Sequence, residues 1–428
     1  MNVHDSERLA GLLEQEGYAA AAESAQADVV VINTCSVRER AEDKLYSRLG
    51  ELRSSDNVSP QTVVVAGCVA QQEGARLLKR SGLVDIVLGT QSLKQLPELL
   101  ARHDRSIRPL VDIDGRDDVS YPLGVVRRGD ATRAYVTIVE GCNDFCAFCI
   151  VPYTRGHERM RATAEILAEV RHAALTGRRE ILLLGQIVNH YQAPDLDGCD
   201  FSALLRLVAA VPGVERVRFA SPHPRHVTTD MVRAMADTPQ VCRHLHLPVQ
   251  SGSTRVLTAM RRRYSREEYL ELVSRLRRAM PDLALTTDMI IGFPGETDAD
   301  FEETMTLLDE VRFQGIFSFK YSPRPNTLAG RQMADDVPES VKADRLTRLQ
   351  TRQRTIRLEH HEALMGARVA VLVEGLSKRR PGDVTGRTQG NTLVNFPGSL
   401  TLVGRTVTVH VRRAGPNAVW GTAEAVGS

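Results

Sequence analysis

Six apolar stretches of strand length lie between residues 135 and 321, and stretches with the periodicity of amphipathic helices alternate with them. Strands that are joined by helices pair in parallel and carry helices on their outer face. A closed eight-fold βα barrel usually needs about 250 residues, so six strands in roughly 200 residues predict a partial βα barrel. The predicted strands are 135–139, 180–184, 214–220, 243–249, 283–291 and 316–321, and the predicted helices are 163–175, 201–211, 229–236, 265–280 and 298–312.

Glycine-containing or polar motifs directly follow most of these predicted strands. In βα barrels the active site lies at the carboxyl ends of the strands, so we expect the motifs to converge on one mouth. Their glycines can let the backbone approach a ligand closely, or they can serve as ordinary turn residues. The motifs are Gly185-Gln186, Ser221-Pro-His-Pro224, Gln250-Ser-Gly-Ser253 and Gly292-Phe-Pro-Gly-Glu-Thr297.

The first predicted strand leads into Cys142, Cys146 and Cys149, which have the spacing C-x3-C-x2-C and an aromatic residue before the last cysteine. Thiolates at this density can reach one metal centre, but a structural zinc ion normally has four ligands. A four-iron, four-sulfur cluster held by three thiolates has one iron without a protein ligand, and that iron can bind a substrate or cofactor. The spacing therefore favours such a cluster. The alternatives are a zinc site completed by His157 and thiols that line a core.

The N-terminal part of the chain has a second α/β pattern. A predicted helix at 6–16 precedes predicted strands at 28–32 and 61–66, which are followed by predicted helices at 37–52 and 71–79. Cys35 and Cys68 come just after the two strands. Open α/β sheets bind ligands at the carboxyl ends of neighbouring strands, so we predict that both cysteines are metal ligands. The alternative is that they are small core residues.

The chain contains seven cysteines, an odd number, and five of them lie in these motifs. A disulfide framework is therefore not expected, and the redox setting is predicted to be reducing. Cys199 and Cys242 have no partner at a metal-ligand spacing and are predicted to be structural, as are His223 and His246. We find no apolar run of the length of a signal peptide or membrane span, so we expect a cytoplasmic protein without a membrane partner.

The character of the sequence changes near the C-terminus. Residues 338–364 are charged and predicted to form a helix, and the alternating strands after it predict a small all-β barrel. The net charge of the chain is +2, so affinity for RNA must come from local patches such as Lys378-Arg-Arg380. Residues 107–130 are predicted to be a connector, and the basic run 261–263 with Tyr264 is predicted to be a solvated face or an RNA contact. The predicted C-terminal strands are 369–374, 385–388, 393–396, 406–413 and 419–423.

Taken together, these motifs resemble the methylthiotransferase family of radical S-adenosylmethionine (radical SAM) enzymes. Within it the chain is most similar to the branch that modifies tRNA at isopentenyladenosine 37, beside the anticodon. The resemblance covers essentially the whole chain and implies an N-terminal methylthiotransferase domain at 1–115, a radical SAM core at 128–360 and an RNA-binding TRAM domain at 363–426. The motifs that carry it are Asn33-Thr-Cys-Ser-Val-Arg38, Gly67-Cys-Val-Ala70, Glu140-Gly-Cys-Asn143, His246-Leu-Pro-Val-Gln-Ser-Gly-Ser253, Gly292-Phe-Pro-Gly-Glu-Thr297 and, for the branch, Val151-Pro-Tyr-Thr-Arg-Gly156.

The resemblance implies two four-iron, four-sulfur (4Fe-4S) clusters and SAM as cofactors. Cys142, Cys146 and Cys149 hold the cluster that binds SAM and breaks its carbon–sulfur bond, and the resulting radical removes hydrogen from C2 of the adenine. A second cluster is held by three cysteines of the first domain, which include Cys35 and Cys68. It carries the sulfur, which a second SAM methylates. The predicted SAM contacts are Gly185, Gln186, Gln250, Ser251, Gly292 and Glu296, and no residue is assigned a catalytic role.

The partner implied by the resemblance is tRNA, through its anticodon loop. An electron donor of the flavodoxin-like or ferredoxin-like type is also expected, and the protein is expected to be a monomer. Two alternative functions stay open. One is a methylthiotransferase that acts on another tRNA adenosine or on a ribosomal protein, and the other is an RNA-binding iron–sulfur protein without sulfur insertion.

The chain departs from the family pattern at its start. In the family the first-domain triad begins with a cysteine in a Gly-Cys-x-Met-Asn motif, whereas this chain begins at Met1-Asn2, which matches the residues after that cysteine. We hypothesise that Met1 is an internal methionine of a longer natural protein. The rival hypothesis is a complete chain that has lost sulfur insertion. Ile187 also stands where the family usually has Asn, which weakens the predicted contacts around Gln186.

Overall fold

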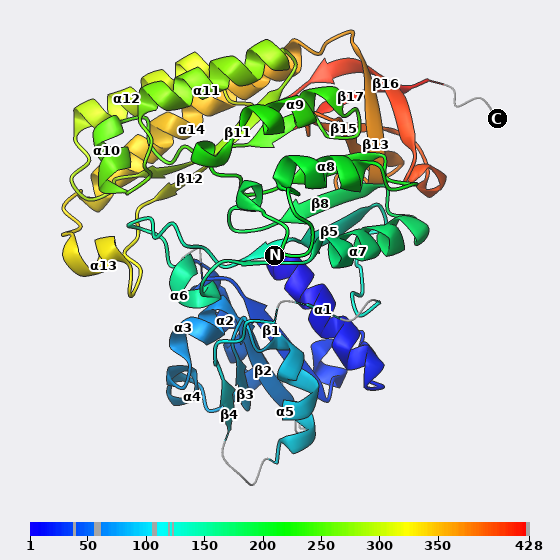
Figure 1. Cartoon of the computed structure of the whole chain (residues 1–428), viewed down its shortest axis with the longest axis vertical. Helices are drawn as coiled ribbons and strands as arrows, with labels where there is room; N and C mark the ends of the chain where they lie inside the picture. Colours follow the sequence, from blue (N-terminus) through cyan, green and yellow to red (C-terminus); the bar gives the residue numbers. More distant parts are fainter. Residues whose placement is uncertain (37–39, 55–60, 105–108, 119, 122–123, 425–428) are drawn as a thin grey trace.

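The computed structural model describes residues 1–36, 40–54, 61–104, 109–118, 120–121 and 124–424. Figure 1 shows three regions in chain order: a parallel sheet that follows the first helix, a middle region of two further parallel sheets with helices outside them, and a closed barrel near the C-terminus. Helix α1 (Asn2–Gln15) and the short helix α6 (Val151–Arg155) lie where the first sheet meets the middle region.

The N-terminal sheet is parallel and has an apolar cluster on each face. In its second strand Val63 and Val65 pack into one cluster, whereas Val64 and Ala66 pack into the other, because successive side chains of a strand point to opposite faces. The sheet order is β1-β2-β3-β4, and the strands are β1 (Val29–Thr34), β2 (Thr62–Gly67), β3 (Ile86–Leu88) and β4 (Leu110–Asp112).

Different helices cover the two faces of this sheet. Leu45 and Leu49 of α2 belong to the cluster of Val63, whereas Leu9 of α1 and Leu99 of α5 belong to the opposite cluster. The arrangement is the α/β layering that the sequence predicts. The helices of this region are α1, α2 (Arg40–Ser54), α3 (Cys68–Glu73), α4 (Arg76–Arg80), α5 (Leu96–Arg102) and the 3-10 helices η1 (Ser24–Gln26) and η2 (Leu93–Gln95).

Three details of this region differ from the prediction. The helix predicted at 71–79 is two helices, α3 and α4, which part at Gly74, where φ is +50°. The predicted connector 107–130 contains β4, which pairs with β3, and β3 itself lies outside the predicted strands. Both strands have three residues, too few for periodicity to reveal. The predicted start of a helix at residue 37 lies outside the described residues.

The middle region contains the six predicted strands in two parallel three-stranded sheets, and this partial βα barrel confirms the predicted fold class. An isolated parallel bridge links Val217 of β9, in the first sheet, to Val241, which lies just before β10 of the second. The strand predicted at 135–139 is interrupted at Ile138, because residues 139–140 turn away to pair with 159–160 across the cysteine loop. The sheet orders are β5-β8-β9 and β10-β11-β12, and the strands are β5 (Arg133–Thr137), β6 (Val139–Glu140), β7 (Arg159–Met160), β8 (Glu180–Leu184), β9 (Arg216–Phe219), β10 (His244–His246), β11 (Ala284–Ile291) and β12 (Gly315–Lys320).

Helices cover the outer side of these sheets and share one core with them. Leu204 of α8 and Phe301 of α12 are buried in the same apolar cluster as Ile181 of β8. Among the described residues, no helix is both long enough and apolar enough to cross a membrane. The remaining helices are α7 (Thr163–Leu175), α8 (Phe201–Ala209), α9 (Thr229–Asp237), α10 (Thr254–Ala259), α11 (Arg266–Ala279), α12 (Asp298–Val311), α13 (Leu328–Gln332), α14 (Glu339–Glu362) and the 3-10 helices η3 (Val188–His190) and η4 (Pro224–His226).

The C-terminal strands close into the predicted all-β barrel, with Val371 and Phe396 in its core. Arg218 of β9 attaches the barrel to the middle region, because its guanidinium donates to the carbonyl oxygens of Gln389 and Thr388 at 2.9 and 2.7 Å. The barrel order is β13-β14-β15-β17-β16, and the elements are β13 (Arg368–Leu376), β14 (Asp383–Arg387), β15 (Leu393–Pro397), η5 (Leu400–Leu402), β16 (Thr406–Ala414) and β17 (Val419–Ala423).

Gly67, the last residue of β2, has a φ of +93°, and a Cβ there would lie 2.4 Å from Oδ1 of Asn33 and 2.5 Å from the carbonyl oxygen of Thr34. We expect Gly67→Ala to lower the free energy of unfolding by more than about 1 kcal/mol, because alanine is strained at positive φ and its methyl group must displace β1. Thermal unfolding followed by circular dichroism measures the change. Gly82→Ala is the control, since Gly82 has ordinary φ and open space at its Cβ. Equal midpoints for the two variants would contradict the prediction.

Candidate active site

The three cysteines of the C-x3-C-x2-C motif lie on one loop between β6 and α6. The loop folds back on itself, and the N–H of Cys149 donates to the carbonyl oxygen of Cys146 at 3.0 Å. Gly141 lets the chain turn into the loop, because its φ is +82° and a Cβ there would lie 2.0 Å from the carbonyl oxygen of His157. The next residue, Cys142, is buried. The loop thus presents three thiols within one short segment.

Burial sets the chemistry of these thiols. It raises the pKa of Cys142 and of Cys149 to about 12, and a negative charge on Cys146 acts in the same direction on both. The thiols are therefore close enough to repel one another when ionised. A metal centre removes this repulsion between the thiolates, because a thiol loses its proton when it binds a metal and the positive metal neutralises the charge that is left. The donor set fits an iron–sulfur cluster bound by three cysteines.

The arrangement disfavours the alternative of a single zinc ion. Zn–S bonds of about 2.3 Å in a tetrahedron place sulfur atoms roughly 3.8 Å apart. Among the described residues, the one set of three possible metal-binding side chains whose ligand atoms lie within 4.8 Å of one another is Asp144, His223 and His226, which contains no cysteine. Cluster ligands bind different iron atoms and need not meet so closely. His157, the proposed fourth zinc ligand, instead has its Nδ1 2.9 Å from Oδ1 of Asn143.

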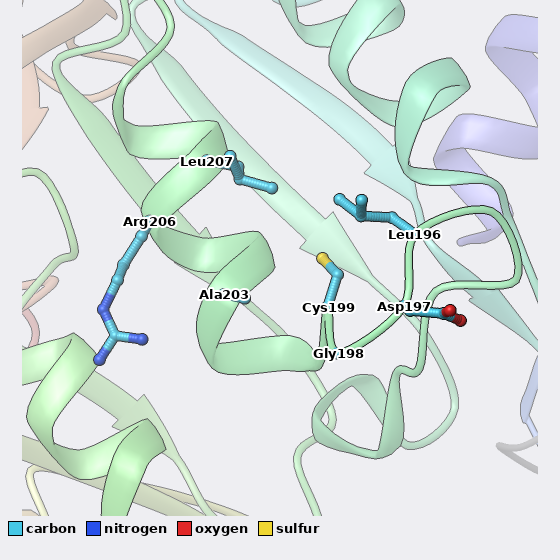
Figure 2. A pocket seen from close by; sticks show the side chains of 7 residues that line it. All are labelled: Leu196, Asp197, Gly198, Cys199, Ala203, Arg206 and Leu207. Atoms are coloured by element: carbon cyan, nitrogen blue, oxygen red, sulfur yellow. The ribbon is translucent and has the colours of Figure 1, made fainter.

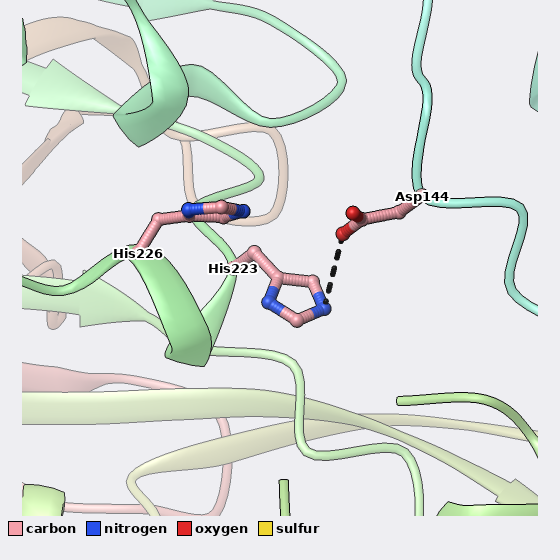
Figure 3. Close-up of side chains that lie close together, drawn as sticks. All are labelled: Asp144, His223 and His226. Carbon is pink, nitrogen blue, oxygen red and sulfur yellow. Dashed lines mark ion pairs between the residues drawn. The ribbon is translucent and has the colours of Figure 1, made fainter. Parts of the chain in front are cut away.

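Asp144 of the cysteine loop faces His223 and His226, which lie beyond β9 (Figure 3). Burial lowers the pKa of His223 to about 2 and that of His226 to about 4, so both rings are neutral. Nδ1 of His223 accepts a hydrogen bond from the N–H of Arg225 at 3.2 Å, so its proton is on Nε2, which lies 3.6 Å from Asp144 Oδ2. The three side chains form a polar cluster beside the cysteine loop.

Cys35 and Cys68 lie next to each other at the carboxyl edge of the N-terminal sheet. They directly follow Thr34 and Gly67, which are partners in the register of β1 and β2. Cys68 is buried as the first residue of α3, whereas Cys35 is partly exposed. This placement meets what the predicted ligand role requires, and the role itself stays a prediction.

Helix α6, which follows the cysteine loop, packs on the N-terminal region close to this pair. The hydroxyl of Thr90 donates to the carbonyl oxygen of Thr154 at 2.5 Å. Arg155 forms a buried ion pair with Asp5 of α1 at 2.5 Å. Burial lowers the pKa of Arg155, but the negative charges of Asp5 and Cys68 outweigh burial and raise it well above its usual value. Helix α6 therefore links the cysteine loop, which it directly follows, to the sheet edge that carries Cys68.

Gly185 and Gln186, both predicted SAM contacts, follow β8. A Cβ on Gly185 would lie 3.1 Å from Cβ of Val139, so this glycine allows close packing within the protein itself. The amide nitrogen of Gln186 donates to Sδ of Met1 at 2.8 Å. Its buried Oε1 has no hydrogen-bond partner within the described part of the chain. That oxygen is available to a ligand, and the SAM contact stays a prediction.

Gln250 and Ser251 lie on the turn after β10, and both are buried. Gln250 has a φ of +77°, which is uncommon for a residue other than glycine, and its N–H donates to the carbonyl oxygen of Asp288 at 2.9 Å. The hydroxyl of Ser251 accepts from the N–H of Ser253 at 3.2 Å. Strained backbone of this kind occurs at ligand-binding sites. The predicted contacts of both residues with SAM stay predictions.

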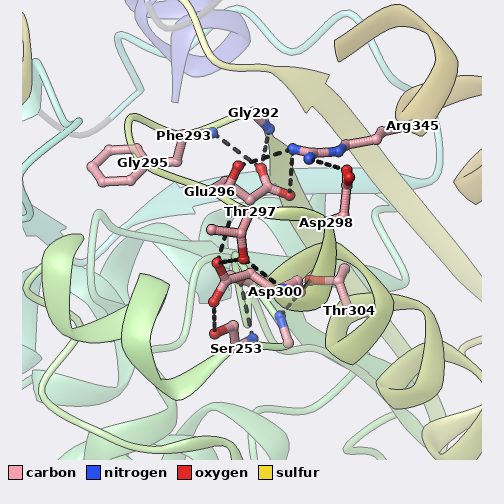
Figure 4. Close-up of polar contacts among 12 residues, drawn as sticks. Ser253, Gly292, Phe293, Gly295, Glu296, Thr297, Asp298, Asp300, Thr304 and Arg345 are labelled. Carbon is pink, nitrogen blue, oxygen red and sulfur yellow. Dashed lines mark hydrogen bonds and ion pairs between the residues drawn. The ribbon is translucent and has the colours of Figure 1, made fainter. Parts of the chain in front are cut away.

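Glu296 holds together the loop that follows β11 (Figure 4). Its Oε2 accepts hydrogen bonds from the N–H groups of Gly292 and Phe293, and its Oε1 lies 3.8 Å from the guanidinium of Arg345. Both carboxylate oxygens therefore have partners in the protein. A Cβ on Gly292 would lie 2.4 Å from Cγ of Lys342, so this glycine also makes room for the protein itself. SAM contacts of Gly292 and Glu296 stay predictions.

The basic run after α10 differs from the predicted solvated face. Arg261 and Arg263 are exposed, but only 6% of Arg262 is exposed, and its Nη1 donates to Sγ of Cys146 at 3.4 Å. Tyr264 also points inward, because its hydroxyl donates to the backbone carbonyl oxygens of Pro248 and Val249, which follow β10. The sequence contains no signal that separates the middle arginine from its neighbours. The geometry of the turn makes that distinction.

A pocket of about 450 Å³ beside α8 contains none of the predicted site residues (Figure 2). Cys199 lies in it together with Leu196 and Leu207. Burial raises the pKa of the Cys199 thiol, so the thiolate, which is the reactive form, is disfavoured. A structural role for Cys199 agrees with this environment and stays a prediction.

The carboxyl group of Glu296 makes stability depend on pH, because burial raises its pKa from 4.5 to about 7. Between pH 4.5 and about pH 7 the carboxyl group is protonated in the folded protein but ionised in the unfolded chain. The contribution of this group to the free energy of unfolding is therefore fully present below pH 4.5 and is lost as the pH rises through 7. We expect Glu296→Gln, which cannot ionise, to gain roughly 2–3 kcal/mol relative to the wild type between pH 5 and pH 8. Urea unfolding at both pH values measures this, with the exposed Glu302→Gln as control. Parallel pH profiles of wild type and Glu296→Gln would refute the expectation.

Three family models match the chain in succession. An uncharacterized protein family, UPF0004, matches residues 1–89, the radical SAM superfamily matches 136–308, and the TRAM domain matches 362–423. The matches follow the order of the three regions of the fold.

Solved radical SAM enzymes have a similar fold. The methyltransferase TsrM from Kitasatospora setae, with cobalamin and a [4Fe-4S] cluster bound, has a TM-score of 0.56 at 15% identity and covers 89% of this chain and 77% of its own. The cobalamin-dependent enzyme OxsB, with aqua-cobalamin and S-adenosylmethionine bound, has a TM-score of 0.51 at 11% identity and covers 82% of this chain and 53% of its own. At these identities the likeness concerns the fold alone.

Curated relatives named tRNA-2-methylthio-N(6)-dimethylallyladenosine synthase match nearly the whole chain. The relative from Geobacter metallireducens is 44% identical over 98% of this chain and 95% of its own length. The one from Acetivibrio thermocellus is 45% identical over 96% and 86%, and the one from Solibacter usitatus is 44% identical over 100% and 96%. These matches confirm the resemblance that the motifs indicate. The chain therefore belongs to the tRNA-2-methylthio-N(6)-dimethylallyladenosine synthase family of radical SAM methylthiotransferases.

Proposed function

We propose that this chain is a tRNA methylthiotransferase that converts N6-isopentenyladenosine at position 37 into its 2-methylthio derivative by radical SAM chemistry. The observation that carries the proposal is that α6 directly follows the loop of Cys142, Cys146 and Cys149 and brings its last residue, Arg155, close to Cys68, at the sheet edge that also carries Cys35. A SAM-cleaving centre and a sulfur-carrying centre can then serve one bound base. Relatives with this activity in their name match 98% of the chain.

In this proposal Cys142, Cys146 and Cys149 hold a 4Fe-4S cluster, and Cys35 and Cys68 supply thiolates to a second one. When bound, the first cluster supplies the electron that cleaves SAM. The chain itself contributes ligands, orientation and the exclusion of water. The six SAM contacts are those named from the motifs, and among them the buried Oε1 of Gln186 has no hydrogen-bond partner in the described part of the chain. No side chain is assigned a catalytic role.

The C-terminal barrel is proposed to bind tRNA. Trp420 lies near two cations, because the guanidinium of Arg413 is 4.1 Å and that of Arg380 is 5.3 Å from its ring centroid. Aromatic and cationic side chains in combination suit the bases and phosphates of single-stranded RNA. We place the domain boundaries at 1–115, 128–360 and 363–426.

Further partners follow from the proposed chemistry. Reductive cleavage of SAM needs an electron donor, for which we propose a flavodoxin-like or ferredoxin-like protein. We propose that the enzyme acts as a monomer and in the cytoplasm, where its tRNA substrate is found.

Two exposed aromatic side chains lie beside the cysteine loop. Phe145 is 40% exposed and Tyr153 is 42% exposed, and their ring centroids are 6.3 Å apart. Unpaired RNA bases stack on aromatic rings of this kind. The pair is therefore suited to contact the anticodon loop near the proposed SAM site.

We expect Tyr153→Ala to weaken the binding of substrate tRNA about 5- to 150-fold, because stacking of one base contributes about 1–3 kcal/mol. Tyr153→Phe keeps the ring and should bind within about twofold of the wild type. Fluorescence anisotropy with labelled tRNA measures both affinities, and iron content shows whether the clusters remain. Leu175→Ala, which changes another exposed side chain, is the control. Equal affinities of Tyr153→Ala and Leu175→Ala would exclude a stacking role.

The cysteine assignments are tested by three variants that are reconstituted without oxygen. We expect Cys142→Ala/Cys146→Ala/Cys149→Ala to lose about four irons per chain and all SAM cleavage. We expect Cys35→Ala/Cys68→Ala to keep SAM cleavage but to form no 2-methylthio nucleoside, because the sulfur-carrying cluster is lost. Iron and sulfide analysis, release of 5'-deoxyadenosine and mass spectrometry of tRNA nucleosides are the measurements. Cys199→Ala is the control and should match the wild type. A methylthio product from the triple variant would overturn the proposed function.

A further inference from the structure

Arg262 is a buried cation in the turn that follows α10. The flanking residues Arg261 and Arg263 are exposed and have left-handed φ angles of +58° and +60°, whereas only 6% of Arg262 is exposed. The turn therefore directs the middle side chain inward. The N–H of Ala147 in the cysteine loop donates to the carbonyl oxygen of Met260 at 2.9 Å, which holds the turn against the loop.

Two hydrogen bonds fix the orientation of the Arg262 guanidinium, and a third then joins it to Cys146. Nη2 donates to the carbonyl oxygen of Pro248 at 3.1 Å, and Nε donates to the hydroxyl of Tyr264 at 3.1 Å. The Tyr264 hydroxyl is itself held, because it donates to the carbonyl oxygen of Val249 at 2.8 Å. With these two bonds in place, Nη1 is directed at Sγ of Cys146, 3.4 Å away.

Among the residues that the structure describes, no carboxylate forms an ion pair with Arg262. Within the described part of the chain, its hydrogen bonds go to two neutral oxygens and to one sulfur. A buried charge without a counter-charge costs several kcal/mol. A neutral thiol at Cys146 would leave this cost in place, whereas a metal-bound thiolate would remove it.

We propose that Arg262 is a positioning residue for the cluster held by Cys142, Cys146 and Cys149: it supplies a buried positive charge and a hydrogen bond to the Cys146 sulfur, and thereby raises the reduction potential of that cluster. The inference rests on the proposed function, because it assumes that these cysteines hold a cluster.

The direction of the effect follows from electrostatics. Reduction adds one electron to the cluster, and a nearby cation stabilises the more negative, reduced form more than the oxidised form. Hydrogen bonds to the sulfur atoms act in the same direction. Burial strengthens the effect, since solvent screens the charge of Arg262 much less than the charges of its exposed neighbours.

The test compares Arg262→Gln and Arg262→Lys with Arg261→Gln and Arg263→Gln, which remove the same charge from exposed positions. Each of the four changes is made separately in the full chain that also carries Cys35→Ala and Cys68→Ala, so that the measured signal comes only from the cluster held by Cys142, Cys146 and Cys149. A redox titration followed by electron paramagnetic resonance gives the potential. We expect Arg262→Gln to shift the equilibrium for one-electron reduction at least tenfold toward the oxidised cluster, which is about 59 mV. Arg262→Lys should shift it less, and the two flanking variants less than twofold.

Each outcome decides whether Arg262 raises the reduction potential of the cluster. A potential of Arg262→Gln that equals those of the flanking variants overturns the proposal, as does a potential of Arg262→Lys as low as that of Arg262→Gln. If Arg262→Gln binds no iron, retention of iron by Arg262→Lys supports the counter-charge role, and loss of iron from both overturns it. Failure of the proposed function is seen separately: a wild-type chain that binds the cluster but makes no methylthio nucleoside would refute that function and leave this test intact.

Discussion

The buried ion pair between Arg155 and Asp5 joins the two parts of the chain that carry the cysteines. Arg155 ends the helix that follows the cysteine loop, and Asp5 lies on the first helix, which packs on the N-terminal sheet. Burying two charges costs several kcal/mol for each, and the cost is recovered only when the partners meet in good geometry. A second buried pair, Arg8 with Glu140 at 3.0 Å, acts across the same boundary. The boundary between the two regions therefore tolerates little displacement, which keeps the two cysteine groups at a defined separation.

Each group of cysteines has a buried arginine beside it. Arg155, which is paired with Asp5, lies close enough to Cys68 for a negative charge there to raise the pKa of Arg155, and Arg262 donates to Cys146. Cations at these positions would stabilise the thiolates of a negatively charged cluster. The electrostatics of the protein thus agree with the ligand chemistry that the cysteine spacing indicates, although the two observations are independent.

Much of the fold could be predicted because its elements repeat a simple pattern. The predicted bounds of the helix at 163–175 and the strand at 180–184 agree with the structure, since both have a complete apolar face or core. Strands β3 and β4 were beyond prediction, because three residues contain too little periodicity. The contacts that Gly185, Gly292 and Glu296 make within the protein could not be predicted from the sequence either. Each contacts a residue that is distant in the sequence, and a motif alone cannot tell whether its glycine makes room for a ligand or for the protein.

The sequence by itself determined which cysteines are candidate ligands and that they follow strands, because cysteine spacing and the alternation of strands with helices are local properties of the chain. It also determined the order of the three regions. Only the tertiary structure decided which of three consecutive arginines is buried against Cys146, that His223 faces Asp144, and that Arg155 of α6 lies near Cys68. These facts depend on long-range packing and on the energy of burying charge, which no single stretch of sequence contains.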